Sequence, residues 1–454
     1  MPTPDFRARA HALVDQLADH FEEAARAGRP AIPYAEPAAA EAYWAGFGGS
    51  ETELFAEAMA RSTAVHHPGY VGHQVAVPQT SALLATWVSD ALNNGSAVYE
   101  MGMANAALER RATAELCAAF GLPATATGIL TSGGSLANLT ALLSARARAE
   151  AAGVEGPYCV LVSEQAHYCI DRAARIMGWG QAGVVELATD ARYRVAAGAP
   201  EAGLTEARRR GRTPIAVVGM ACTTSTGSYD DLDALAGFAR ANGLWSHVDA
   251  AHGGAARFSE SERVLTAGIE RADSITLDAH KMMGVPALTT ALLYAREDDS
   301  YRTFAQRADY LWGDAGPEWY HGGQRTVECT KHMMGLRLWA AMRDGGLERI
   351  GAYVARQHAL ARAFAKTLRE RPGWELAVEP QSNIVCFRQN PPYLAEPGAL
   401  DGHNAALRAR YLADGRWYVV NTKLRGVYWL RVTLMNAATT VADLDAMLTF
   451  GEAG

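Results

Sequence analysis

Short apolar runs alternate with helical stretches through the middle of the chain, from about residue 115 to residue 295. Six of these runs have the length of strands: 158–163, 183–188, 215–221, 246–250, 274–278 and 289–295. Helical segments lie between them, such as 135–150 and 231–242, the first with leucines at the spacing of helix turns. Strands that alternate with helices predict an α/β fold with a mostly parallel central sheet and helices on both faces. Several runs are continuously apolar, which is typical of strands buried on both sides.

The two ends of the chain do not show this alternation of strands and helices. Residues 1–30 predict an amphipathic helix that ends near Gly28, and residues 331–369 predict one long helix. Three further strands follow, at 382–387, 418–422 and 428–434. We therefore expect an N-terminal helical segment (1–66), a large domain (67–335) and a small C-terminal α/β domain (336–454). The first helix either packs on a partner subunit or is a solvated surface helix, and its pattern does not decide between them.

Composition narrows the class of protein. Lys and Arg number 42 and Asp and Glu 49, giving a net charge of −7, whereas a dedicated nucleic-acid binder normally has a basic face. No apolar run is long enough to span a membrane, and the N-terminus has no secretory apolar core. The six cysteines form no CxxC pair, so we expect buried, reduced thiols, no metal site and a cytoplasmic location. They are Cys117, Cys159, Cys169, Cys222, Cys329 and Cys386.

Three motifs carry candidate chemistry. In TSGGSLANL (131–139) an apolar run ends in two glycines and a helix begins at once, which suits a phosphate, although a plain capped turn is at least as common. In HVDAAHGG (247–254), Asp249 ends an apolar strand at the edge where α/β sheets bind ligands, although such an Asp can also cap a turn. In SITLDAHKMMG (274–284), Lys281 follows another strand, where apolar surroundings would lower its pKa.

Taken alone, Lys281 is more often a surface lysine. Taken in this order, the three motifs are what pyridoxal phosphate (PLP) requires. Lys281 would form the Schiff base, Asp249 would keep the pyridine nitrogen protonated, and the glycine turn with His280 would hold the phosphate. Asp249 and Lys281 lie 32 residues apart, enough for one crossover between neighbouring strands.

At this level of detail the sequence resembles the PLP-dependent group II amino-acid decarboxylases, which act on glutamate, cysteine sulfinate, aromatic amino acids or diaminobutyrate. The resemblance covers about residues 66–448. Its markers are TSGGSLANL and the segments 67–74, 91–101, 163–180, 222–232, 242–254, 272–286 and 430–447. It implies the fold of aspartate aminotransferase, PLP as cofactor and an amino-acid substrate. It also implies a homodimer with sites at the subunit interface, against which residues 1–66 would pack.

The resemblance also implies site residues. Lys281, His167 and Asp249 would be catalytic, with His167 stacked on the ring, whereas the pattern alone would make it an ordinary interior histidine. The cofactor-binding set would add Gly133, Gly134, Ser135, Thr224, Ala251 and His280. Arg431, Asn94 and His73 would bind substrate, and an internal salt bridge is the alternative for Arg431.

Three departures from the family pattern concern the substrate or the product of the reaction. The loop 310–329 would bring a Tyr that reprotonates the α-carbon, and Tyr320 is the nearest candidate although it lies beyond the usual place. His252 stands where relatives have Trp or Tyr, and VGHQ (71–74) differs from the segment that reads an acidic side chain. We expect decarboxylation of an L-amino acid to its amine. The alternative is the same fold with another outcome, such as oxidative decarboxylation–deamination to an aldehyde or another carbon–carbon lyase reaction.

Overall fold

The computed structural model describes residues 5–304, 318–394 and 396–453. The chain forms two compact units. The small unit comprises Met1–Val77, Ala359–Glu379 and Asn383–Gly454, and the large unit comprises Pro78–His358 and Pro380–Ser382. The domain limits expected from the sequence (1–66, 67–335 and 336–454) stay predictions.

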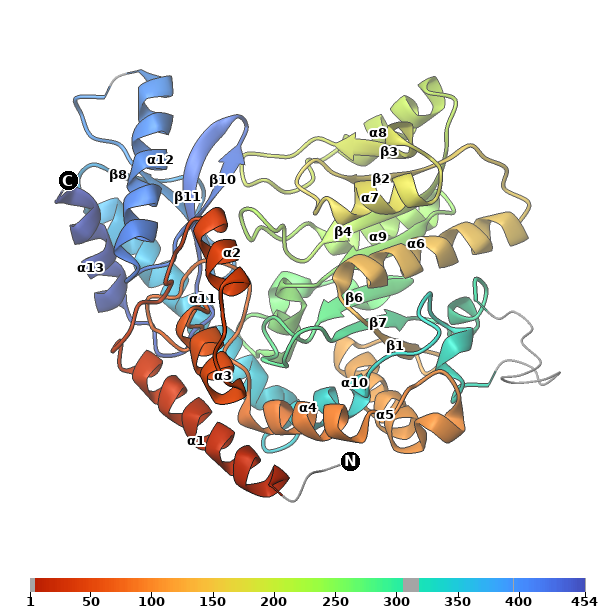
Figure 1. Cartoon of the computed structure of the whole chain (residues 1–454). Coiled ribbons are helices and arrows are strands. Elements are labelled where there is room, and N and C mark those ends of the chain that lie inside the picture. The colour runs from red at the N-terminus through yellow and green to blue at the C-terminus, as the bar shows by residue number, and fades with distance from the viewer. Residues whose placement is uncertain (1–4, 305–317, 395, 454) are drawn as a thin grey trace. The chain divides into compact units, whose positions relative to one another are not determined.

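A seven-stranded sheet forms the centre of the large unit, in the order β1-β7-β6-β5-β4-β2-β3 (Figure 1). β7 pairs antiparallel with β1 and β6, and the other neighbours pair in parallel. This confirms the predicted mostly parallel sheet. The strands are β1 (Thr127–Thr131), β2 (Tyr158–Ser163), β3 (Val184–Leu187), β4 (Thr213–Met220), β5 (Trp245–Asp249), β6 (Ser274–Asp278) and β7 (Thr290–Tyr294).

Helices cover both faces of this sheet. Val160 and Val162 of β2 pack in one core with α6 and α7, whereas Cys159 and Leu161 pack in another with α8 and α9. The alternation follows from the two-residue period of a strand, and it explains why these strands are continuously apolar. The helices of the large unit are α4 (Thr80–Leu92), α5 (Met103–Phe120), α6 (Gly134–Ala151), α7 (Cys169–Ile176), α8 (Ala199–Arg209), α9 (Leu232–Ala241) and α10 (Met334–Ala341).

The small unit contains a four-stranded antiparallel sheet in the order β10-β11-β9-β8. Its core includes Phe364, Phe387 and Tyr411, all fully buried. The elements of this unit are α1 (Phe6–Ala25), α2 (Pro37–Ala45), α3 (Glu51–Ala60), β8 (Trp374–Leu376), β9 (Ile384–Gln389), α12 (Pro397–Asp414), β10 (Val420–Leu424), β11 (Val427–Thr433) and α13 (Val441–Glu452). The boundary between the units falls within α11 (Gly346–Glu370).

Two sequence predictions are wrong in detail. The stretch expected to be helical over 331–369 contains two helices, α10 and α11, because residues 342–345 between them include Asp344 and Gly345, whose positive φ interrupts the right-handed helix. None of the six cysteines, all within the described residues, forms a disulfide, and Cys329 is exposed where a buried thiol was expected.

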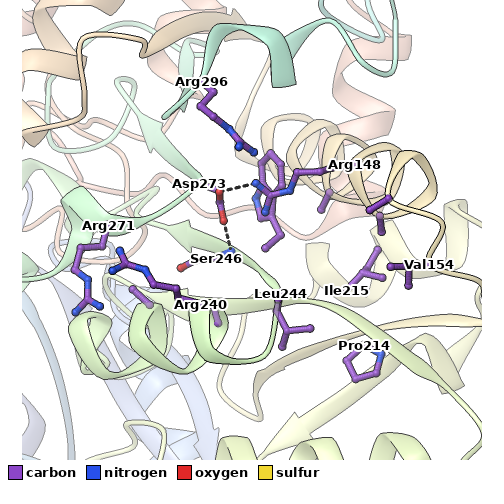
Figure 2. Close-up of a pocket in the computed structure, with 17 residues that line it drawn as sticks. Arg148, Val154, Pro214, Ile215, Arg240, Leu244, Ser246, Arg271, Asp273 and Arg296 are labelled. Carbon is purple, nitrogen blue, oxygen red and sulfur yellow. Dashed lines mark hydrogen bonds and ion pairs between the residues drawn. The ribbon is translucent and has the colours of Figure 1, made fainter.

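A cavity of about 460 Å³ lies where β5 and β6 begin (Figure 2). Asp273 accepts hydrogen bonds there from Arg148 Nη1 (2.7 Å) and from the Ser246 N–H (2.9 Å). The Arg148 guanidinium also lies 4.1 Å from the centre of the Trp245 ring. These contacts tie the starts of both strands to α6, so the strand ends at the opposite edge have fixed positions.

Candidate active site

A second cavity, of about 260 Å³, lies at the carboxyl ends of β4, β5 and β6. All nine residues predicted to contact the cofactor line it: Gly133, Gly134, Ser135, His167, Thr224, Asp249, Ala251, His280 and Lys281. The cavity at the start of β5 and β6 is larger, and so is an open hollow of about 830 Å³ beside Tyr320. Neither is lined by both a strand-end carboxylate and a lysine, so the smaller cavity is the candidate site.

The turn between β1 and α6 needs its glycines. Gly133 has a φ of 109°, in the region that favours glycine. At Gly134, a Cβ would lie 2.9 Å from Asp278 Oδ1, which is closer than real contacts allow. The first turn of α6 therefore approaches the cavity through bare backbone, with Ser135 beside it. A helix N-terminus in this setting attracts a phosphate.

Lys281 is held by the carboxylate of Asp278, a residue for which the sequence predicted no role. Its Nζ lies 2.9 Å from Asp278 Oδ2. Burial alone would lower the pKa of Lys281, but the negative charges of Asp278 and Asp249 outweigh burial and raise this pKa above its ordinary value. The lowered pKa predicted from the apolar surroundings is therefore wrong, because the strand end carries a buried anion.

The two strand-end carboxylates differ in electrostatics. Burial raises the pKa of Asp249 above its ordinary value, and the charge of Lys281 only partly offsets this effect. Burial acts in the same direction on Asp278, but Lys281, His280 and a hydrogen bond from Thr290 together lower its pKa. Asp278 is thus the ionised partner of Lys281, whereas Asp249, equally buried, accepts hydrogen bonds from Asn138 Nδ2 (2.9 Å) and the Ala251 N–H (3.1 Å).

Two of the histidines that line the cavity, His167 and His280, have ring orientations fixed by hydrogen bonds. The Nδ1 of His167 accepts a hydrogen bond from the Cys169 N–H (3.3 Å), and burial lowers the pKa of His167. The Nδ1 of His280 lies 3.0 Å from the Thr289 carbonyl oxygen, to which it can donate. Because the neutral ring of His167 accepts a hydrogen bond at Nδ1, its hydrogen lies on Nε2.

Four predicted residues do not line this cavity. Tyr320 borders the open hollow, where its ring centre is 5.3 Å from that of Tyr99, and part of its loop (310–317) is outside the described residues. Asn94 is exposed and donates to the Leu92 carbonyl oxygen. Arg431 and His73 belong to the small unit, where burial and then the charge of Arg431 lower the pKa of His73. Their functions stay predictions.

Other lining residues had no predicted role. Asn138 lies in the TSGGSLANL motif, one helical turn beyond Gly134, and Asp278 lies in the motif of Lys281. Helical spacing and adjacency to a strand end were the available signals. Cys222 and His252 also line the cavity.

The residues present fit PLP. The bare backbone turn 133–135 at the start of α6, the buried carboxylate of Asp249 and the amine of Lys281 match the phosphate, ring nitrogen and aldehyde of PLP. When bound, PLP supplies an electron sink for the bond broken in the substrate.

Comparisons with known proteins agree. A model of the pyridoxal-dependent decarboxylase conserved domain matches residues 57–390. L-2,4-diaminobutyrate decarboxylase of Rhizobium meliloti (strain 1021) is 32% identical over 410 residues, covering 87% of this chain and 79% of that protein. Human cysteine sulfinic acid decarboxylase is 29% identical over 405 residues, covering 84% and 81%.

Among solved structures, Catharanthus roseus tryptophan decarboxylase in complex with L-tryptophan superposes with a TM-score of 0.88 at 21% identity, covering 100% of this chain and 98% of that one. This likeness shows the fold. Within the described residues, no helix is long and apolar enough to cross a membrane. The chain belongs to the pyridoxal-dependent decarboxylase family and is a PLP-dependent amino-acid decarboxylase.

Proposed function

We propose that the 260 Å³ cavity is the catalytic centre and that Lys281 bonds the cofactor. Asp249 faces the ring nitrogen, His167 covers the ring face, and the 133–135 turn with His280 holds the phosphate. The supporting observation is that nine residues from separate motifs line one cavity at the carboxyl ends of the parallel strands.

In this proposal each side chain has a task set by its charge. Asp278 holds the Lys281 ammonium in place and is the carboxylate that would accept its proton when the amine acts as a nucleophile toward PLP. Asp249, ionised, holds a proton on the ring nitrogen that it faces. His167 is neutral, so it can lie against the ring without adding a second positive charge.

The site assignment has a direct test. Borohydride reduction of the holoenzyme followed by peptide mapping should place the pyridoxyl group on Lys281. Lys331 is the matched control, because its Nζ is also buried and ion-paired, 2.7 Å from Glu109 Oε1. A label on Lys331, or on any lysine other than Lys281, would overturn the assignment.

The expected reaction is the release of carbon dioxide from an L-amino acid to give its amine. A substrate panel headed by L-2,4-diaminobutyrate, cysteine sulfinate and L-tryptophan, under air and under argon, tests both substrate and outcome. Equal amounts of amine in the two atmospheres would support the proposal. An aldehyde formed only in air would replace it with the oxidative reaction.

We also propose a homodimer, in which Tyr320 and Asn94 serve the cavity of the second copy. α4 supports this with an exposed apolar row of Leu84, Trp87, Val88 and Leu92, a surface that protein partners commonly cover. A cytoplasmic location is also proposed, because none of the six cysteines of the described chain forms a disulfide.

Hybrid dimers test the shared site. K281A and Y320F are purified separately, then mixed so that subunits exchange. If Tyr320 serves the partner's cavity, the hybrid has one site with both residues intact, and activity rises well above that of either parent. Activity that never exceeds the parents', although exchange is verified by mass, would mean that Tyr320 acts within its own chain or has no role.

Arg431 and His73 remain proposed substrate contacts. R431K should raise KM more than it lowers kcat if the guanidinium orients a carboxylate through two parallel hydrogen bonds. A lower unfolding temperature with unchanged KM would instead favour the internal salt bridge.

A further inference from the structure

A row of buried polar side chains leads from Asp249 away from the cavity. Each member is at most 5% exposed, and successive members are joined by hydrogen bonds of 2.8 or 2.9 Å. We call this row the Asp249 relay. Its members, in order, are Trp245, Ser274, His247, Asn138 and Asp249.

The two ends of the relay fix the direction of every bond in it. The indole Nε1 of Trp245 can only donate, so Ser274 Oγ accepts from it and has its own proton left for His247 Nδ1. At the other end an ionised Asp249 can only accept, so it takes a hydrogen from Asn138 Nδ2. The Oδ1 of Asn138 then accepts from His247 Nε2. All four bonds therefore point toward Asp249.

Further contacts hold the central members in these orientations. Asn138 Nδ2 also lies 3.2 Å from Cys169 Sγ, so its second hydrogen has an acceptor and turning the amide over would lose both bonds. Burial lowers the pKa of His247 to about 4, so this ring is neutral at physiological pH and carries one hydrogen. With Nδ1 accepting from Ser274, that hydrogen lies on Nε2, as the relay requires.

The secondary structure brings the members together. Trp245, His247 and Asp249 are alternate residues of β5 and therefore share one face of the sheet. Ser274 is the register partner of His247 on β6, and Asn138 comes from α6, which packs against β5 and β6. Three elements thus contribute to one buried network. Removing one member costs much free energy, because the polar groups left unpaired cannot be hydrated by water.

We propose that the Asp249 relay keeps Asp249 ionised and correctly oriented, and so keeps the proton on the ring nitrogen of the bound cofactor. This inference rests on the proposed function, in which Asp249 faces that nitrogen. Asn138 supplies the hydrogen bond that stabilises the carboxylate, and His247 polarises the Asn138 amide from behind. Asn138, His247 and Ser274 are positioning residues, acting through Asp249 rather than on the substrate.

The inference predicts where the proton moves when the relay is broken. Without the bond from Asn138, the carboxylate becomes more basic, because the charge it carries has lost a donor. The proton then shifts from the ring nitrogen to Asp249, leaving a neutral ring that is a poorer electron acceptor. We expect N138L to lower kcat by about 10- to 100-fold, the usual weight of a hydrogen bond to a charged group, with little change in KM.

The readout is the nitrogen chemical shift of the cofactor ring, measured by solid-state NMR on holoenzyme reconstituted with PLP labelled at the ring nitrogen. This shift distinguishes a protonated ring from a neutral one, and a merely structural role would not move it. N138L, H247L and S274A should move the shift toward the neutral value. H247Q should stay near wild type, because its amide nitrogen can replace His247 Nε2 as donor to Asn138.

Two controls separate the possible failures. S144A removes a buried hydroxyl from the same helix, where it contacts Tyr294 Oη at 3.1 Å outside the relay, and it should leave the shift unchanged. D249N should move the shift fully. If D249N does not move it, the proposed role of Asp249 is wrong, whereas a shift moved by D249N but by none of the relay variants overturns the relay alone.

Two further measurements cover poor folding. Should N138L fail to fold, S274A decides, because it removes one hydroxyl and leaves His247 Nδ1 without its donor. In the apoenzyme, nitrogen NMR of His247 should show a neutral ring with its hydrogen on Nε2. A hydrogen on Nδ1 would reverse two bonds of the relay and refute it.

Discussion

The pairing of Lys281 with Asp278 makes a measurable contribution to the stability of the apoenzyme. Asp278 is almost fully withdrawn from water, with its side chain 4% exposed, and Lys281 is mostly buried, with its side chain 20% exposed. Removing one partner of a buried ion pair leaves the other charge unpaired, which typically costs about 3–5 kcal/mol. D278N keeps the shape but removes the charge. We expect a loss near the lower limit, about 3 kcal/mol, because Asp249 still attracts Lys281.

A matched substitution next to the start of the same strand calibrates this value. Asp273 immediately precedes β6 and pairs with Arg148 at 2.7 Å, but both side chains are 25% exposed (Figure 2). Solvent screens this pair, so D273N should cost no more than about 1 kcal/mol, and its amide oxygen can still accept from the Ser246 N–H. The contrast between the Asp→Asn changes before the start and at the end of β6 tests the effect of burial.

Urea unfolding of the three apoenzymes provides the measurement, compared at equal m-values. The sign of the pH dependence follows from the two pKa shifts. The lowered pKa of Asp278 gives stability that is present above the ordinary Asp pKa and lost as pH falls through its folded value. The raised pKa of Lys281 gives stability that is present below the ordinary Lys pKa and lost as pH rises through its folded value.

The difference between wild type and D278N should therefore stay constant between about pH 5 and pH 9. A D278N midpoint equal to that of D273N would refute the burial argument. A difference that grows steadily from pH 5 to pH 9 would show that Asp278 is protonated at neutral pH, contrary to the assigned direction of its pKa.

Two other substitutions test separate parts of the large unit. G134A should weaken PLP binding by at least about 10-fold, measured by absorbance titration, because its Cβ would lie 2.9 Å from Asp278 Oδ1; unchanged affinity would show that the turn has room to shift. D230N should destabilise the apoenzyme by about 1–3 kcal/mol in urea, because the carboxylate accepts from the N–H groups of Val195 and Met220 (both 2.8 Å) and an amide can accept only one of them. A cost below about 0.5 kcal/mol would show that water replaces the lost acceptor.

The sequence pattern predicted the sheet well because buried parallel strands leave a strong signal. β2 and β6 have the predicted limits, and β3, β4, β5 and β7 differ from the predicted limits by one or two residues at each end. The same reasoning failed between α10 and α11. The apolar pattern there stays helical, but positive φ angles at residues 344–346 interrupt the helix. Periodicity reports which side of a helix is buried and is insensitive to a short break in it.

The candidate site was predictable to the extent that motifs end at the same edge of a sheet. The electrostatics were not, because the pKa of Lys281 depends on the distance from its Nζ to Asp278, and apolar neighbours in the sequence suggested the opposite direction. A strand-end carboxylate three residues before a lysine can point into the cavity or away from it. Only the structure shows that it points toward the amine.

The Asp249 relay illustrates the same division within a single network. Alternation along β5 places Trp245, His247 and Asp249 on one face, and this much follows from residue numbers alone. Which β6 residue lies opposite His247 depends on strand register, and which α6 residue reaches Asp249 depends on helix packing; neither is encoded in a local pattern. In this proposal the chemistry of Asp249 is therefore set by Asn138, 111 positions away in sequence, as well as by its own motif. A family motif that contains Asp249 and Lys281 predicts the presence of a cofactor, whereas its protonation state requires the three-dimensional contacts of Asn138.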